Sequence, residues 1–188
     1  MAKRRADPSF EVRADGRGRG LFARRRLRAG TRLFGADDWA DDGAERASFI
    51  VLSPRQVAAL APPARTAFLR YAYHCGPRRI AGTFHHTAVR HPSNFINHCC
   101  EPNAGYDGAD AILTLRAIAA GEEIHMDYGT YSFAFDHEFV CRCGAPSCRG
   151  RVMQHDWKTL VRRGLKLPRF MRGQVERLLR APAARGRR

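Results

Sequence analysis

Apolar and polar residues alternate over short stretches in most of the first 130 residues, which predicts several short strands rather than long helices. Residues 10–13 (FEVR) show this alternation, and residues 111–115 (AILTL) form the clearest strand. Further strands are expected at 21–23 and 31–34, and between residues 80 and 128 where Gly, Pro and Asn separate apolar runs. The pattern therefore predicts a mainly β protein with short helices, of the α+β class.

Helices are predicted where start and stop signals occur. Ser53-Pro54 combines an N-cap serine with proline at the first helical position, and this helix is expected to run through Leu60. Pro62-Pro63 breaks it, and a second helix is expected to run to about Cys75. A last helix is expected over residues 168–179, where apolar side chains fall on one stripe.

The composition fits one folded domain with some appended structure. The chain has 188 residues, 44% of them hydrophobic, and no apolar run long enough to cross a bilayer, so no membrane partner is expected. The first residues lack the apolar segment of a secretory signal. We therefore expect a reducing compartment, where six cysteines favour metal binding over the alternative of disulfides.

The net charge is +15, and it is unevenly distributed. Residues 151–188 hold 12 Lys or Arg and two acidic residues. This basic tail is expected either to contact nucleic acid nonspecifically or to form a solvated helix face. Residues 35–47 form an acidic loop, expected either to steer basic peptides or to be a solvated connection. Its acidic residues are Asp37, Asp38, Asp41, Asp42 and Glu45.

Three segments in a fixed order carry the candidate chemistry. Residues 141–148 have the spacing C-x-C-x4-C, which suits a tetrahedral zinc but leaves it one ligand short. The cysteine pair Cys99-Cys100, within residues 94–103 (NFINHCCEPN), can supply the fourth ligand. Between these two segments lie residues 121–129 (GEEIHMDYG).

Together these segments resemble the SET-domain protein lysine methyltransferases that carry a post-SET zinc loop. The resemblance implies a SET fold of small curved sheets with a knot-like C-terminal threading. It also implies a zinc-bound post-SET loop and a C-terminal helix. The expected divisions are a SET domain over 10–130, a post-SET zinc loop over 136–152 and a basic helical tail over 153–188.

The resemblance further implies S-adenosylmethionine (AdoMet) as cofactor. The expected activity is methylation of lysine side chains in histones or other basic nucleic-acid-associated proteins. Tyr128 corresponds to the catalytic tyrosine. Trp157 is expected either to close over the adenine or to be an ordinary core anchor. The other implied residues are Gly18, Arg19, Gly20, Asn97 and His98 for the cofactor, Tyr73, Tyr106 and Met126 for the substrate channel, and Cys100, Cys141, Cys143 and Cys148 for a structural zinc.

Several positions depart from the family's pattern. Asn94 replaces an arginine, Cys99 replaces a serine, and Met126 stands where the family has the phenylalanine or tyrosine that limits methyl addition. A non-catalytic SET-fold module, recruited to nucleic acid or chromatin by the basic tail, is therefore the alternative. A zinc nucleic-acid binder unrelated to methyltransferases would leave the two upstream motifs unexplained.

The arginine-rich composition and the single-domain layout look bacterial. We therefore expect a monomer in the cytoplasm, at the nucleoid, with export to a host as the alternative location.

Overall fold

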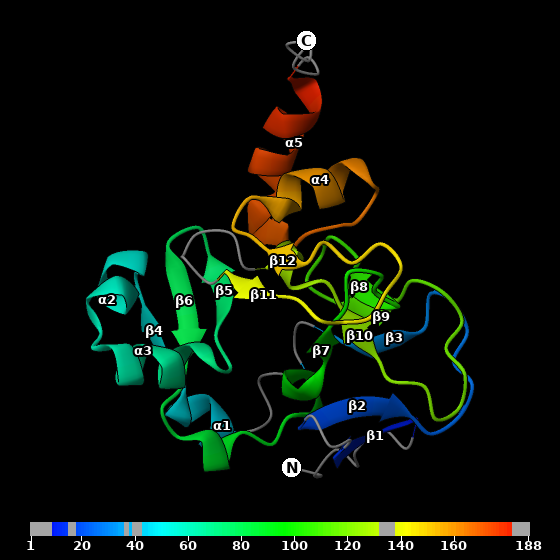
Figure 1. Ribbon diagram of the computed structural model, residues 1–188, viewed down its shortest axis with the longest axis horizontal. Helices are drawn as coiled ribbons and strands as arrows, with labels where there is room; N and C mark the ends of the chain where they lie inside the picture. Colours follow the sequence, from blue (N-terminus) through cyan, green and yellow to red (C-terminus); the bar gives the residue numbers. More distant parts are fainter. Residues whose placement is uncertain (1–8, 15–17, 36–37, 39–42, 132–137, 182–188) are drawn as a thin grey trace.

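The computed structural model describes residues 9–14, 18–35, 38, 43–131 and 138–181 (Figure 1). Within these ranges the strands form five separate sheets of two or three strands. This confirms the predicted mainly β class with short helices, which is consistent with the SET fold. None of the helices in the described ranges is long and apolar enough to cross a membrane.

The elements are as follows. The strands are β1 (Phe10–Ala14), β2 (Arg19–Ala23), β3 (Arg32–Phe34), β4 (Ile50–Leu52), β5 (Tyr73–Gly76), β6 (Arg79–Gly82), β7 (Asn97–His98), β8 (Ala104–Tyr106), β9 (Ile112–Thr114), β10 (His125–Met126), β11 (Phe139–Val140) and β12 (Arg151–Val152). The α-helices are α1 (Gly43–Ser48), α2 (Pro54–Ala59), α3 (Pro62–Leu69), α4 (Asp156–Arg162) and α5 (Arg172–Arg180), and the 3₁₀ turns are η2 (His86–Ala88), η3 (Pro92–Phe95), η4 (Tyr128–Thr130) and η5 (Arg169–Met171).

The main hydrophobic core lies between the β1–β2 hairpin and the three-stranded sheet β3-β9-β8. Two isolated bridges, Phe22 with Glu123 and Leu27 with Ile118, join the hairpin to the segment that leads into β10. This core packs behind the segments that carry the candidate site. Its buried residues include Leu21, Leu27, Ile96, Ala104, Ile118, Ile124 and Met126.

A second small sheet, β4-β6-β5, is covered by α2 and α3 and lies on the left in Figure 1. The predicted start of α2 is confirmed, because Ser53 and Gln56 form a reciprocal capping box. In this lobe the ring of Phe68 lies 2.7 Å from the position that a Cβ on Gly82 would take. A glycine is therefore needed on β6 for α3 to pack this closely.

The second predicted helix ends earlier than expected. The prediction of helix to about Cys75 is wrong, because α3 ends at Leu69 and Tyr73–Gly76 form strand β5. This strand pairs antiparallel with β6 across a short turn. The pairing satisfies backbone groups and places Tyr73 at the candidate site, so tertiary pairing overrides the local helix pattern.

The two central motifs lie side by side, as the resemblance implied. Strand β7 pairs in parallel with β10, with Asn97 opposite His125. Asn103 fixes the same pair of segments, since its Nδ2 donates to the Glu123 carbonyl (2.8 Å) and its Oδ1 accepts from the His125 N–H (2.7 Å). Backbone pairing and the Asn103 side chain thus hold residues 97–103 beside residues 123–128.

The C-terminal region begins with the hairpin β11–β12 and ends with the helices α4 and α5, which project from one end of the molecule (Figure 1). Helix α4 was not predicted. The last helix was predicted, but α5 starts at Arg172 because Arg169–Met171 form the 3₁₀ turn η5. A separate hydrophobic cluster holds this region together through Trp157, Val161, Leu167 and Met171.

The prediction of an acidic loop is corrected at Glu45. This residue lies in α1, is 5% exposed, and accepts hydrogen bonds from the N–H groups of Arg90 and His91 and from Asn94 Nδ2. Glu45 therefore fixes the start of η3 and does not belong to an acidic surface. Asp37, Asp41 and Asp42 lie outside the described residues.

Candidate active site

Two cavities of different size are lined in part by residues of η3 and η4. The small cavity has a volume of about 240 Å³ and the large cavity about 680 Å³. The second volume lies in the range of pockets that bind drug-sized ligands. Four residues line both cavities, so the cavities adjoin at these side chains. They are Arg70, Tyr71, Asn94 and Tyr128.

Tyr128 has a fixed position at this junction. Its hydroxyl donates to the Ile96 carbonyl (2.9 Å), and its ring packs against those of His98 and Tyr131. Burial raises the pKa of the Tyr128 hydroxyl to about 12. Tyr128 is therefore a neutral hydroxyl group at ordinary pH, in contact with both cavities.

The large cavity is bordered by two segments that a side chain links. Asn97 Nδ2 donates to the Arg19 carbonyl (3.1 Å) and to Glu123 Oε1 (2.8 Å). Glu123 is 9% exposed and pairs with His125 Nε2 at 3.2 Å. A Cβ on Gly20 would lie 2.4 Å from Glu123 Oε1, so only glycine allows this carboxylate to pack against β2.

The small cavity is lined largely by aromatic rings. Tyr71, Tyr73, Tyr106, Tyr128 and Tyr131 all contribute to its wall. Burial raises the pKa of Tyr73 to about 12 and that of Tyr106 further still. These tyrosines are therefore neutral at ordinary pH, and they line the cavity together with Arg70 and Asp110. Burial beside their rings disfavours a charged amine relative to the free base.

A segment near the C-terminus completes the small cavity. Pro168 and Phe170 line it, and Lys166 forms an isolated bridge with Tyr106 on β8. Asp110 holds this segment, because its Oδ1 accepts from the Arg169 N–H at 2.7 Å. The wall of the small cavity thus depends on residues that follow the hairpin β11–β12 in the sequence.

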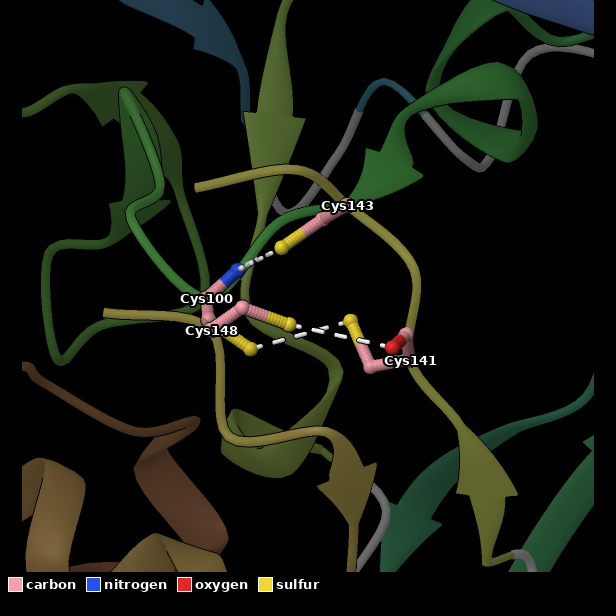
Figure 2. Close-up of side chains that lie close together, drawn as sticks. All are labelled: Cys100, Cys141, Cys143 and Cys148. Carbon is pink, nitrogen blue, oxygen red and sulfur yellow. Dashed lines mark hydrogen bonds between the residues drawn. The ribbon is translucent and has the colours of Figure 1, made fainter. Parts of the chain in front are cut away.

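Figure 2 shows a cluster of four cysteines, two of which, Cys141 and Cys143, line the large cavity. The Sγ atoms of Cys100, Cys141, Cys143 and Cys148 all lie within 4.8 Å of one another, and those of Cys100 and Cys141 are 3.7 Å apart. Sulfurs around a tetrahedral zinc, with Zn–S bonds of about 2.3 Å, would be separated by about 3.8 Å. The donor set and its spacing therefore fit zinc, and Cys75 and Cys99 are not among the four.

Backbone N–H groups donate to three of the four sulfurs, while burial raises the pKa values of the Cys100 and Cys141 thiols. The N–H of Cys100 donates to Cys143 Sγ (3.5 Å), the Arg149 N–H to Cys100 Sγ (3.4 Å) and the Gly150 N–H to Cys148 Sγ (3.5 Å). At Cys143, burial is outweighed by such bonds, which lower the pKa of that thiol to about 6. A metal needs ligands in this deprotonated form.

His98 links the cluster to Tyr128. Its Nδ1 accepts the Tyr128 N–H (3.1 Å), and its Nε2 lies 3.4 Å from Cys100 Sγ. Burial lowers the pKa of His98 to about 4, so the ring is neutral at ordinary pH. Since Nδ1 is an acceptor, the ring proton sits on Nε2 and is directed at the Cys100 sulfur, as outer-shell donors to metal ligands are.

Comparison with known proteins decides the family. The model of the SET domain matches residues 18–129, more than half of the chain. This chain belongs to the SET-domain family. The match lies inside the predicted division of 10–130, and the cysteine hairpin and the C-terminal helices follow it.

Individual relatives match the SET domain over shorter stretches. One, from Saccharomyces cerevisiae, is named "Histone-lysine N-methyltransferase, H3 lysine-4 specific" and is 42% identical over 66 residues, which is 31% of this chain and 6% of the relative. The Drosophila melanogaster "Histone-lysine N-methyltransferase trithorax" is 42% identical over 65 residues, 30% of this chain and 2% of the relative. The human "Histone-lysine N-methyltransferase EHMT1" is 41% identical over 69 residues, 30% and 5% respectively. The chain thus spans less than a tenth of the length of these relatives.

Most residues singled out in the sequence gather at the two cavities of this SET domain. Gly18, Arg19, Asn97 and His98 line the large cavity with Tyr128. Tyr73, Tyr106 and Met126 line the small cavity. Gly20 does not line the large cavity, since it packs behind Glu123.

Trp157 lies elsewhere. It is 8% exposed within the C-terminal hydrophobic cluster and lines neither cavity. The expectation that it closes over a bound adenine is therefore corrected, and the alternative of a core anchor agrees with its position. Phe139 and Val140 of β11 line the large cavity beside the cysteine hairpin.

Sequence reasoning missed several residues of the site. Glu123 and His125 line the large cavity, while Tyr131 and Phe170 line the small one. Arg149 joins the cysteine hairpin to the segment of Tyr128 by an ion pair with Asp127 (2.6 Å). The sequence could have indicated two of these residues by their positions. Tyr131 lies one turn beyond Tyr128, and Arg149 directly follows Cys148.

Proposed function

We propose that this SET domain is an AdoMet-dependent protein lysine N-methyltransferase. The observation that carries the proposal is the junction of the two cavities at Tyr128. A reaction that joins a bulky donor to a slender acceptor needs two such compartments with one shared opening. The names of the relatives, all histone-lysine N-methyltransferases, support the same reaction.

The large cavity suits the cofactor. AdoMet, when bound, supplies a methyl group that a neutral amine can attack. The side chains available to hold it include Asn97, which is fixed by Arg19 and Glu123, and Glu123 itself, a carboxylate suited to an ammonium or a hydroxyl group. The neutral His98 ring stabilises the segment behind them.

The small cavity suits the side chain of lysine. Its tyrosine-lined wall disfavours the ammonium form, so the amine loses its proton more readily than in water. Tyr128, with its pKa raised to about 12, keeps its proton and can orient the nitrogen through its oxygen. Holding the amine beside Tyr128, where the two cavities share their lining, would supply rate acceleration by proximity.

Zinc at the cysteine cluster would be structural. Four thiolates give a closed shell with no position for water or substrate. In this role the metal fixes the hairpin β11–β12, which forms part of the large cavity through Phe139 and Val140. We assign this hairpin as the post-SET zinc loop of the chain.

The proposed substrate is a lysine-bearing basic protein, either a histone or another protein associated with nucleic acid. The test is incubation of the purified chain with AdoMet carrying a heavy methyl label and with pools of basic proteins, followed by mass spectrometry. The proposal predicts labelled lysines in at least one pool. Label on no lysine, although the chain binds AdoMet, would favour the alternative of a non-catalytic SET-fold module.

We also propose that α4 and α5 contact nucleic acid. Exposed basic side chains on and around these helices form no ion pair with any described residue, and their charge suits phosphate groups. These residues are Lys158, Arg162, Arg163, Lys166, Arg172, Arg177 and Arg180.

A monomer in the cytoplasm, and a bacterial origin, remain predictions from the sequence.

Binding of a fluorescent DNA duplex at about 50 to 200 mM salt tests this second proposal. Changing Arg162, Arg163, Arg177 and Arg180 to glutamine should weaken binding and flatten its salt dependence, by about 0.9 in slope for each phosphate that the protein no longer neutralises. The matched control changes Arg24, Arg25, Arg26 and Arg28, exposed arginines of the turn after β2, to glutamine. Equal effects of the two sets would show that only net charge matters.

A further inference from the structure

Asp127 is a fully buried carboxylate directly before Tyr128, the proposed catalytic residue. Its residue exposure is 1%, and its side chain is completely covered. Oδ1 accepts the Gly129 N–H at 2.9 Å, so Asp127 caps the short turn η4 that begins with Tyr128. The orientation of this carboxylate therefore helps to set the backbone from which the Tyr128 side chain projects.

The partner of this carboxylate comes from the cysteine hairpin. Arg149 Nη1 donates to Asp127 Oδ2 at 2.6 Å, and Nη2 donates to Asp127 Oδ1 at 2.8 Å. Its Nε donates to Asp156 Oδ2, at the start of α4, at 2.9 Å. Such a two-pronged bond between guanidinium and carboxylate fixes the plane and distance of both groups.

The other end of Arg149 is held by the cysteine cluster. Arg149 directly follows Cys148, and its own N–H donates to Cys100 Sγ at 3.4 Å. The backbone N–H of Arg149 thus contacts a sulfur of the cluster, while its guanidinium contacts Asp127, the cap of the turn η4 that begins with Tyr128. The two attachments are separated by no more than the length of one side chain, so a shift at one end moves the other.

We propose that Arg149 is a positioning residue that couples the state of the cysteine cluster to the placement of Tyr128. The proposal rests on the methyltransferase function proposed above for the role of Tyr128, but the coupling itself does not depend on it. With the cluster loaded, Arg149 holds Asp127 and the turn η4 in place. With the cluster empty, the hairpin loses its anchor and the clamp on Asp127 loosens.

The residue type matters for this role. Lysine could balance the buried charge of Asp127, but its single ammonium group cannot form the bidentate pair that fixes both carboxylate oxygens. Removing the charge altogether leaves a buried carboxylate unpaired, which destabilises a protein strongly. Arg151, two residues on, offers a matched control, because it pairs with Glu138 on the surface, where its side chain is 59% exposed.

The variants are Arg149→Met, Arg149→Lys, Arg151→Met and the double change Asp127→Asn with Arg149→Met. The double variant keeps Oδ1 as the cap for Gly129 and removes both charges, so it is expected to fold even where Arg149→Met does not. Metal content, AdoMet affinity and steady-state kinetics with a lysine substrate are measured for each. For Arg149→Lys and the double variant, we expect kcat to fall about 10- to 100-fold, as for a misplaced catalytic group.

The split between the kinetic constants separates positioning from general damage. KM for the substrate and the AdoMet affinity should stay within about threefold of the unaltered protein, because the lining of both cavities is unchanged. Arg151→Met should match the unaltered protein in every measurement. Full kcat in the double variant would overturn the proposal, since Arg149 would then only neutralise a buried charge.

A measurement that needs no activity completes the test. Chains labelled with fluorotyrosine give a ¹⁹F resonance for each tyrosine, and Tyr128→Phe identifies the resonance of residue 128. Removing the metal with a chelator should shift this resonance in the unaltered protein and in Arg151→Met, but much less in Arg149→Met or the double variant, where the clamp is already open. A Tyr128 resonance that does not respond to metal removal would overturn the proposal, even if the protein proved not to be a methyltransferase.

Discussion

Asn97 joins two segments that are 78 residues apart in the sequence. Its Nδ2 donates both to the Arg19 carbonyl and to the Glu123 carboxylate, and all three residues line the large cavity. At the scale of single residues, such contacts hold together at the site segments that are distant in sequence. Tyr128 and His98 show the same pattern, since each of them bonds to a segment distant in sequence.

Asn97→Ala should weaken AdoMet binding about 10- to 100-fold. The change leaves the nearly buried carboxylate of Glu123 without one of its donors, and losses of this kind are about 1–3 kcal/mol, or roughly tenfold for each 1.4 kcal/mol. Titration calorimetry measures the affinity, and a melting curve checks that the fold is intact. Unchanged affinity in a folded variant would remove Asn97 from the cofactor site.

At the scale of elements, the sequence predicted what local signals and motifs control. The α2 start at Ser53 and the cysteines 141, 143 and 148 were found from residue type and spacing, and Cys100 followed from the resemblance to the family. Strand β5 was predicted as helix because its pairing with β6 is a tertiary contact, which no window of sequence contains. Glu45 was placed on the surface for the same reason, because its partners at 90–94 are distant in the chain.

Glu45→Ala should lower the stability of the fold and disturb the junction of the cavities. The carboxylate accepts three hydrogen bonds in a buried setting, and a buried donor left without its acceptor costs about 1–3 kcal/mol. The midpoint of urea unfolding measures this change. Glu11→Ala is the control, because Glu11 pairs with Arg24 at the exposed surface, and it should shift the midpoint little.

Cys143→Ser should remove the bound metal and weaken AdoMet binding. The remaining three sulfurs cannot complete a closed shell, and the hairpin β11–β12 that lines the large cavity loses its anchor. Metal analysis together with calorimetry tests both effects. Cys75→Ser, at an exposed thiol outside the cluster, should retain about one zinc per chain, and equal metal content in both variants would contradict the assignment.

At the scale of the whole molecule, three regions meet around one junction of two cavities. The SET domain supplies Tyr128 and both central motifs, the hairpin β11–β12 borders the large cavity, and the segment before α5 completes the small cavity. Figure 1 shows α4 and α5 projecting away from β1 and β2 at the opposite end. The region that follows the SET domain therefore belongs to the site as well as carrying the basic charge.

Stability should fall steeply as the pH rises from about 10 towards 12. The pKa values of Tyr73 and Tyr128 are raised by burial from 10 to about 12, so in this window the unfolded chain releases protons that the folded chain retains. The stabilisation is complete below pH 10 and is lost as the pH approaches 12. The test records melting temperatures and tyrosinate absorbance across this pH range. Ionisation of the buried tyrosines at pH 10, before the chain unfolds, would contradict this account.

The most direct test of the account compares Tyr128→Phe with the unaltered protein in two measurements on the same samples. One is single-turnover methyl transfer to a lysine substrate, and the other is AdoMet affinity by calorimetry. Since Tyr128 lines both cavities and is proposed to act on the reacting amine, the variant should lose methyl transfer by about 100-fold or more while its AdoMet affinity stays within about threefold. Methyl transfer at the unaltered rate by Tyr128→Phe would contradict the central claim that the reaction takes place at this junction.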